Sequence, residues 1–291
     1  MERLLVVGVD GSESSLQAVD WSVAEAARHG AALRLVHASR HERHGSAEPE
    51  PDAGLPAGPG AAEHIVATAV ERARRASRPV KAEGAVIAAD PVDALLGEDR
   101  RAWALVVGSR GRGTLAGLLL GSVSLSVSAR AHCPVVVVRG AEPAITGTFR
   151  RITLGIGDAA ADSAVVRFAL DEAEARGCEL HAVRAWRAPA HHVQYHPLLT
   201  GGPHVAHEEL ASEELTAAVG VSLPDRSPAV LHREVAEGPV AKVLLEASAA
   251  SDLLVVGATR TVHRTGLQLG RAGHTVLHHA SCPVAVVPRS V

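Results

Sequence analysis

The most restrictive feature of this sequence is that it repeats itself. Leu-Val-Val-Gly ends at Gly108 in the first half and again at Gly257 in the second. Cys-Pro-Val begins at Cys133 and again at Cys282, and both pairs lie 149 residues apart. Such a spacing predicts a tandem duplication, and 291 residues suffice for about two domains. We expect domains over 1–140 and 150–291, joined by a linker over 141–149.

Each half alternates predicted strands with predicted helices. Short apolar runs with many β-branched residues indicate buried strands, and apolar residues at helical spacing separate them. Gly30 is expected to end the first helix. This order predicts an α/β fold of two doubly wound domains, each with a five-stranded parallel sheet in the order 3-2-1-4-5. Stretches 41–62 and 187–204 lack any period and are predicted to be irregular. The strands expected in the first half are 4–9, 32–38, 80–88, 104–107 and 135–138.

Composition and charge narrow the class of protein. A formal net charge of −3 disfavours a nucleic-acid surface, which needs a basic face. No apolar run approaches the ~20 residues of a membrane span, and Met1 leads directly into the first strand. Three scattered cysteines suit neither a disulfide framework nor a zinc site, and Cys133 and Cys282 are expected to be small buried side chains. We therefore expect a cytoplasmic protein with neither a nucleic acid nor a membrane as partner.

The chemistry of the first half centres on a glycine-rich stretch, Gly108–Ser124. It follows a predicted strand and opens a predicted helix. Glycines allow backbone N–H groups to approach phosphate oxygens, and a helix start adds unpaired donors and a positive dipole end. In the expected strand order, strands one and four are neighbours at the switch point. Asp10 and Gly108, which end these two strands, should therefore face one crevice. The glycines of the stretch are Gly108, Gly111, Gly113, Gly117 and Gly121, with Ser122 and Ser124 behind them.

These residues resemble the universal stress protein family. The family's ATP-binding pattern, Gly-x2-Gly-x9-Gly-Ser, matches Gly108, Gly111, Gly121 and Ser122. The opening Val-Gly-Val-Asp-Gly-Ser and the later Leu-Val-His-Ala are also similar to the family. The resemblance implies that adenine and ribose are held by Asp10 and by the backbone around Gly8, Val9 and Ala38. It implies that Gly108 and Gly111 approach the ribose and the phosphates. It also implies that the phosphates are bound by the N–H groups and hydroxyls of Gly121, Ser122, Val123 and Ser124.

Two arginines flank this loop. Arg110 and Arg112 can meet phosphate charge, or they can be ordinary solvated surface residues. We include Arg110 among the expected nucleotide-binding residues. A magnesium ion can accompany the phosphates, held mostly by them and by water.

The resemblance implies a nucleotide-dependent stress-response or regulatory module with at most slow ATP hydrolysis. No residue stands out as catalytic or as a ligand of a resident metal. A regulatory protein partner and a homodimer belong to the same expectation. Two alternatives stay open: a nucleotide-free structural protein, and an adenylating enzyme of the nucleotide-alpha-hydrolase class. The latter carries a Ser-Gly-Gly-x-Asp-Ser loop after strand one, where this chain has Val-Asp10-Gly-Ser-Glu-Ser.

The second half departs from the motif. Arg260 stands at the position of Gly111, and Arg271 at the position of Ser122, whereas Gly257, Gly270 and Asp158 are retained. The hypothesis is that this half binds nucleotide poorly or in an altered way. The chemically alike edge strands 135–138 and 284–287 further predict that the two halves pack together as an intramolecular pseudo-dimer.

Histidines cluster in two places of the second half. Imidazole is a common metal ligand. The first cluster lies within an irregular stretch, and neither shows a paired-histidine motif with a neighbouring acid. We therefore expect solvated histidines rather than a metal site. The clusters are His191, His192, His196, His204 and His207, and then His274, His278 and His279.

Overall fold

The computed structural model describes residues 3–39, 60–76, 80–111, 120–157, 162–187, 203–220, 230–260 and 267–289. It divides into two compact units, residues 1–139 with 261–268, and residues 140–260 with 269–291. Most of the two stretches expected to be irregular, residues 41–59 and 188–202, lies outside the described residues.

The first unit contains a parallel sheet with the strand order β3-β2-β1-β4-β5, which confirms the predicted order. The short strand β10 (Leu267–Gln268) also falls within this unit. The strands of the sheet are β1 (Leu4–Gly8), β2 (Ala32–Ala38), β3 (Ala82–Ile87), β4 (Ala104–Gly108) and β5 (Val135–Val138). The helices are α1 (Glu13–His29), α2 (Ala61–Arg75), α3 (Pro91–Leu96) and α4 (Ser122–Arg130).

Local sequence accounts for where these helices begin and end. The Ser12 side chain accepts a hydrogen bond from the Ser15 N–H and caps α1. Gly30 takes the left-handed conformation, with φ of 59°, and ends the same helix as predicted. Asp90 caps α3 through the N–H of Val92, and Pro91 occupies the first turn, where its missing N–H has no cost.

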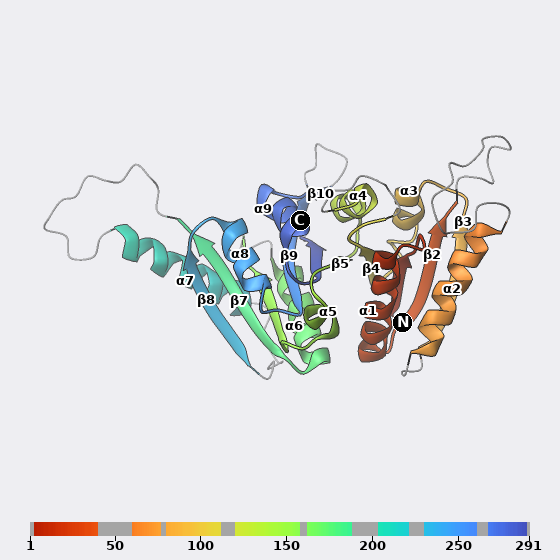
Figure 1. Ribbon diagram of the computed structural model, residues 1–291. Coiled ribbons are helices and arrows are strands. Elements are labelled where there is room, and N and C mark those ends of the chain that lie inside the picture. Colours follow the sequence, from red (N-terminus) through yellow and green to blue (C-terminus); the bar gives the residue numbers. More distant parts are fainter. Residues whose placement is uncertain are drawn as a thin grey trace, which may run out of the picture. The chain divides into compact units, whose positions relative to one another are not determined.

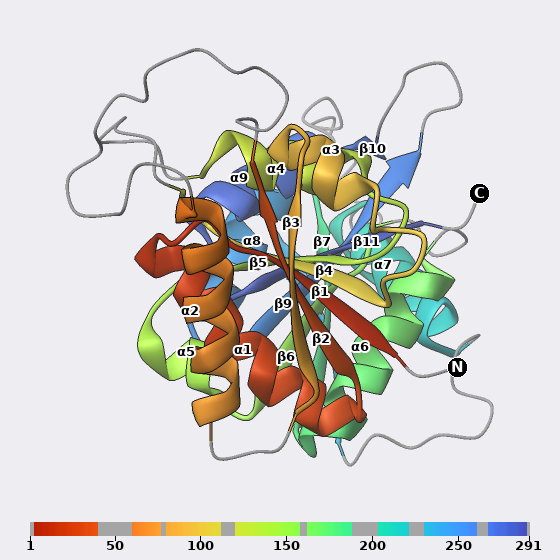
Figure 2. The same cartoon turned by 90° about the vertical axis from the view of Figure 1, so that its right-hand side faces the viewer.

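Helices cover both faces of this sheet. α1 packs against α2, and α3 packs against α4 (Figure 2). Right-handed crossovers in this strand order place the first pair on one face and the second pair on the other. Every residue of β4 is buried, as expected for a central strand of a parallel sheet. α3 and α4 lie near the carboxyl ends of the strands (Figure 1).

The second unit repeats this architecture, with the strand order β11-β9-β6-β7-β8. Its strands therefore correspond to those of the first unit in the same 3-2-1-4-5 order. The strands are β6 (Arg151–Gly155), β7 (Glu179–Trp186), β8 (Leu231–Glu237), β9 (Leu253–Arg260) and β11 (Val284–Pro288). The helices are α5 (Glu142–Thr146), α6 (Ser163–Arg176), α7 (Pro203–Gly220), α8 (Val240–Ser248) and α9 (Arg271–His279).

The segment expected to be a linker is attached to the second unit. It carries α5, and its two ends hydrogen-bond to that unit. The N–H of Ala141 donates to the Ser281 carbonyl over 3.3 Å, and the N–H of Phe149 donates to Oδ1 of Asp252 over 2.9 Å. The expected pseudo-dimer of the two units stays a prediction. Among the described helices, none combines the length and apolar character that crossing a membrane requires.

Candidate functional site

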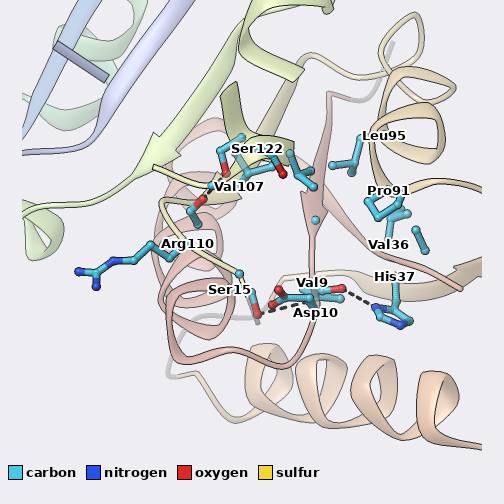
Figure 3. Close-up of a pocket in the computed structure, with 17 residues that line it drawn as sticks. Val9, Asp10, Ser15, Val36, His37, Pro91, Leu95, Val107, Arg110 and Ser122 are labelled. Carbon is cyan, nitrogen blue, oxygen red and sulfur yellow. Dashed lines mark hydrogen bonds between the residues drawn. The ribbon is translucent and has the colours of Figure 1, made fainter. Parts of the chain in front are cut away.

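A cavity of about 410 Å³ opens at the carboxyl ends of β1, β2 and β4 in the first unit (Figure 3). Strands one and four are neighbours there, as the switch-point argument predicted. All eleven residues expected from the sequence to form the site line this one cavity. They are Gly8, Val9, Asp10, Ala38, Gly108, Arg110, Gly111, Gly121, Ser122, Val123 and Ser124.

The helix α4 presents its N-terminus to this cavity. Gly121 is its N-cap and supplies no side chain, whereas Ser12 and Asp90 cap α1 and α3. The first hydrogen bond of the helix runs from the N–H of Leu125 to the Gly121 carbonyl, over 3.1 Å. The N–H groups of the first turn therefore have neither an intrahelical acceptor nor a capping side chain. They point the positive end of the helix dipole toward the cavity. These groups belong to Ser122, Val123 and Ser124.

Two details correct the expected roles in this turn. The N–H of Gly121 donates to the Ser109 carbonyl over 2.8 Å, so it closes the loop instead of facing a ligand. Ser124 is buried, and its hydroxyl donates to the Gly108 carbonyl over 2.7 Å. A hydroxyl has one proton to donate, so the hydroxyl of Ser124 is not a phosphate donor in this geometry. Ser122 is the serine here whose hydroxyl makes no hydrogen bond to another described residue.

The three motif glycines differ in what surrounds them. A Cβ on Gly108 would lie 2.6 Å from the backbone carbonyl of Ser14, so this glycine allows α1 to pack against the end of β4. A Cβ on Gly111 would lie 2.7 Å from Oδ2 of Asp10. A Cβ on Gly121 would meet nothing closer than 3.7 Å, an ordinary contact, and its backbone angles suit any residue. Packing therefore explains why position 108 is glycine, but it does not explain why position 121 is glycine.

Asp10 is held in place by the first turn of α1. Its Oδ1 accepts the backbone N–H of Ser12 over 3.0 Å and the hydroxyl of Ser12 over 2.6 Å. This network sets a carboxylate at the end of β1, where it can accept hydrogen bonds from a ligand. Arg110 contributes differently from what was expected. Arg110 lines the cavity, but its guanidinium extends away from the other lining residues (Figure 3).

Six further lining residues were missed by sequence reasoning. Val36, Pro91, Leu95 and Val107 give one part of the cavity apolar walls. Nδ1 of His37 lies 2.7 Å from the Val9 carbonyl oxygen, and a carbonyl only accepts, so Nδ1 carries the proton. His37 stands within the Leu-Val-His-Ala motif, which was the available signal for it. The missed residues are Ser15, Val36, His37, Pro91, Leu95 and Val107.

In the second unit, an ion pair occupies the corresponding crevice. Nε of Arg289 lies 2.5 Å from Oδ1 of Asp162, whose side chain is fully buried. A Cβ on Gly257 would lie 2.7 Å from Nε of Arg289 and 2.8 Å from Oδ1 of Asp162. A Cβ on Gly157 would lie 2.5 Å from the same guanidinium. The Arg289 guanidinium therefore lies close to both Gly157, just after β6, and Gly257 of β9.

The arginines named for this unit are only partly described. Arg271 is exposed and begins α9, behind the N-cap Gly270. Asp158 and the side chain of Arg260 lie outside what the structure describes, as does Arg112 in the first unit. The sequence did not single out Asp162 or Arg289.

The remaining histidines and cysteines are placed as follows. His207 lies on α7 and not in a loop, whereas His191, His192 and His196 lie outside the described residues. The rings of His274 and His278 stack on α9, with centroids 4.5 Å apart. Cys133 and Cys282 are buried, as expected, and so is Cys178. Burial raises the pKa of the Cys133 thiol to about 12 and that of Cys178 to about 11.

The sheet is open and parallel, and its crevice lies at the switch in strand order. α/β proteins of this class bind their ligands there, beyond the carboxyl ends of the strands. The family model described as "Universal stress protein family" matches residues 1–139 and 148–288. This chain belongs to that family, as a tandem member with two copies of the domain.

One known relative and one solved structure match this chain over nearly its whole length. The universal stress protein Rv2005c of Mycobacterium tuberculosis is 33% identical over 291 residues, which cover 98% of this chain and 97% of the relative. The crystal structure of a universal stress protein from Archaeoglobus fulgidus is 17% identical and covers 99% of this chain and 98% of its own, with a TM-score of 0.71. A universal stress protein solved in complex with cAMP is 33% identical over 47% of this chain and 97% of its own, with a TM-score of 0.37.

Proposed function

We propose that the first unit binds ATP in the cavity at the carboxyl ends of β1, β2 and β4. The observation that carries this proposal is the uncapped N-terminus of α4. Three N–H groups in its first turn, together with the Ser122 hydroxyl, form a site for an anion. No acidic residue lies in that turn to satisfy the helix dipole.

The cavity is chemically divided in a way that suits a nucleotide. Leu95, Pro91, Val36 and His37 line one side, and Ser122 lies apart from His37 (Figure 3). In our proposal the adenine packs on the apolar side and the phosphates extend to the first turn of α4. Asp10 accepts hydrogen bonds from the ribose hydroxyls. A magnesium ion accompanies the phosphates, bound by their oxygens and by water.

The proposed activity is regulation by binding, with hydrolysis at most slow. The lining side chains able to take up a proton are Asp10 and His37, and both already have partners. Asp10 accepts from Ser12, and His37 donates through Nδ1 to Val9 and keeps its acceptor at Nε2. No contact among the described residues aims either group at an attacking water. Occupancy of the site alters the surface around α4, and we propose that this surface signals nucleotide levels to a protein partner under stress.

A pair of equivalent variants tests the ATP site. Gly121 and Gly270 hold the same N-cap position in α4 and α9, and a Cβ at either meets no close atom. Gly121→Glu places a carboxylate at the proposed phosphate position. Gly270→Glu places the same charge in the second unit, where Arg289 and Asp162 fill the crevice. Both variants should fold, as judged by circular dichroism.

Calorimetric titration with MgATP is the measurement, with cAMP, the ligand named for one relative, titrated alongside. Gly121→Glu should weaken ATP binding about 100-fold or more, because it sets like charges in contact within a partly closed site. Gly270→Glu should bind as the parent chain does. The ATP site in the first unit is ruled out if Gly121→Glu binds ATP as well as the parent, or if the parent shows no binding.

A further inference from the structure

Three potential metal ligands meet on the second unit, away from the crevice at the strand ends. Glu179 is the first residue of β7, and His181 follows two residues later, so both side chains project from the same face. His232 on β8 is the register partner of His181. The site therefore lies at the amino ends of these strands, opposite the end that binds ligands in this fold.

The distances within this cluster fit a single metal ion. Nε2 of His181 lies 3.1 Å from Oε2 of Glu179, and Nε2 of His232 lies 3.5 Å from the same oxygen. One ligand atom from each residue lies within 4.8 Å of the other two. A tetrahedral zinc ion bound at 2.0–2.1 Å separates its ligand atoms by about 3.3–3.4 Å. The two observed separations lie on either side of that value.

The first unit offers an internal comparison. At the same place in its sheet, the register partners on β2 and β3 are Arg34 and Glu83. Nη1 of Arg34 donates to Oε1 of Glu83 over 2.6 Å, and Nε of Arg34 lies 3.2 Å from Oε2 of the buried Glu98. The second unit has imidazoles at both positions, with ring centroids 4.3 Å apart, and a carboxylate beside them. The two copies therefore differ at this place: the first has ion pairs, and the second has a set of residues that can bind a metal.

An ion can reach this cluster from solvent. The side chains of Glu179 and His232 are 46% and 47% exposed, whereas that of His181 is 15% exposed. The cation Arg151 is the register partner of Glu179 on β6, so the carboxylate has a positive neighbour on its other side. Two neutral imidazoles and one carboxylate are donors that suit a first-row divalent transition metal better than calcium or magnesium.

We infer that Glu179, His181 and His232 bind one divalent transition-metal ion, of which Zn²⁺ is the expected species. Three protein ligands leave the fourth tetrahedral position to water or to an added anion. This site is independent of the nucleotide cavity, because its residues lie on β7 and β8 of the other unit.

The test uses the full-length untagged chain, dialysed against EDTA and then into buffer. Zn²⁺ is titrated calorimetrically into the parent, into His181→Gln/His232→Gln, and into a control, His274→Gln/His278→Gln. The control removes the other described pair of stacked histidines. The first double variant should lose one equivalent of bound Zn²⁺ relative to the parent, and the control should keep it. Co²⁺ in place of Zn²⁺ should give the visible absorption of a tetrahedral site in the parent and the control.

The proposal is overturned if His181→Gln/His232→Gln keeps the same number of bound Zn²⁺ ions with the same affinity. If that variant does not fold, Glu179→Gln serves instead, because it changes a half-exposed side chain and leaves both imidazoles in place. It should also lose that equivalent and the Co²⁺ absorption. Unchanged Zn²⁺ binding and an unchanged Co²⁺ spectrum in Glu179→Gln would equally exclude the site.

Discussion

The hydroxyl of Ser124 donates a 2.7 Å hydrogen bond to the carbonyl oxygen of Gly108. This bond ties the first turn of α4 to the end of β4, and it lies beneath the candidate nucleotide cavity. Ser122, two residues earlier, lines the same cavity, but its hydroxyl has no hydrogen-bond partner among the described residues. The two serines of one motif therefore differ: the Ser124 hydroxyl bonds within the protein, and the Ser122 hydroxyl is the one that we propose binds the ligand.

Separate alanine substitutions distinguish these two roles. Ser124→Ala should lower the free energy of unfolding by about 1 kcal/mol, since a buried hydrogen bond is lost, with little change in ATP affinity. Ser122→Ala should leave stability unchanged and weaken ATP binding about 10-fold, because a hydrogen bond to a charged phosphate contributes about 1.5–3 kcal/mol. Urea titration and calorimetry measure the two quantities. Equal effects of both variants on both quantities would contradict this assignment.

The glycines at 108 and 121 should respond differently to a single added methyl group. Gly108→Ala forces a Cβ to within 2.6 Å of the Ser14 backbone, so α1 must move. We expect a loss of about 1–3 kcal/mol in the free energy of unfolding, typical of overpacking. Gly121→Ala meets its nearest atoms at 3.7 Å and should cost little stability. Chemical denaturation of both variants checks this, and an equally stable Gly108→Ala would refute the close approach of α1.

The ion pair in the second unit should be sensitive to removal of one partner. Arg289→Ala leaves the carboxylate of Asp162 buried without its guanidinium, which should cost about 3–5 kcal/mol in the unfolding of that unit. Arg75→Ala, which breaks the exposed pair with Glu71, should cost less than about 1 kcal/mol. Thermal unfolding followed by calorimetry resolves the two cases. Similar small losses in both variants would argue against a buried pair.

The buried thiols should be inert in the folded chain. With its pKa raised to about 12, only about one Cys133 thiol in 10,000 is ionised at pH 8, and the thiolate is the reactive species. Raising the pH increases that fraction, so alkylation should accelerate steadily from pH 8 to pH 10. Iodoacetamide labelling followed by mass spectrometry should show little modification in native protein and full modification in urea. Rapid labelling of native Cys133 at pH 8 would contradict this prediction.

The strands and helix ends could be predicted because their signals are local, and the strand order was expected from the alternation of strands with helices. Runs such as Val135–Val138 are apolar on both faces, and Gly30 provides the left-handed position that ends α1. The crevice followed from topology, since the strands ending at Asp10 and Gly108 had to be neighbours. α5 was missed because its five residues are too short to show a helical period.

Other features depend on contacts that no local pattern reveals. Asp162 and Arg289 lie 127 residues apart, and His181 and His232 meet only through the register of β7 and β8. The hydrogen-bond partners within the glycine loop could also not be predicted from the motif. The motif indicated that Gly121 and Ser124 belong to the site. Only the structure shows that the Gly121 N–H and the Ser124 hydroxyl form hydrogen bonds within the protein.

The guanidinium of Arg289 lies beside Gly157 and Gly257 in the second unit, and this placement has a consequence for the proposed response to nucleotide concentration. If ATP binds in the first unit alone, as we propose, a single chain has no second site through which ATP binding could become cooperative. Its saturation curve should be a simple hyperbola with a Hill coefficient of one. Any sharper response in the cell then has to come from assembly of several chains or from the partner that reads the bound state.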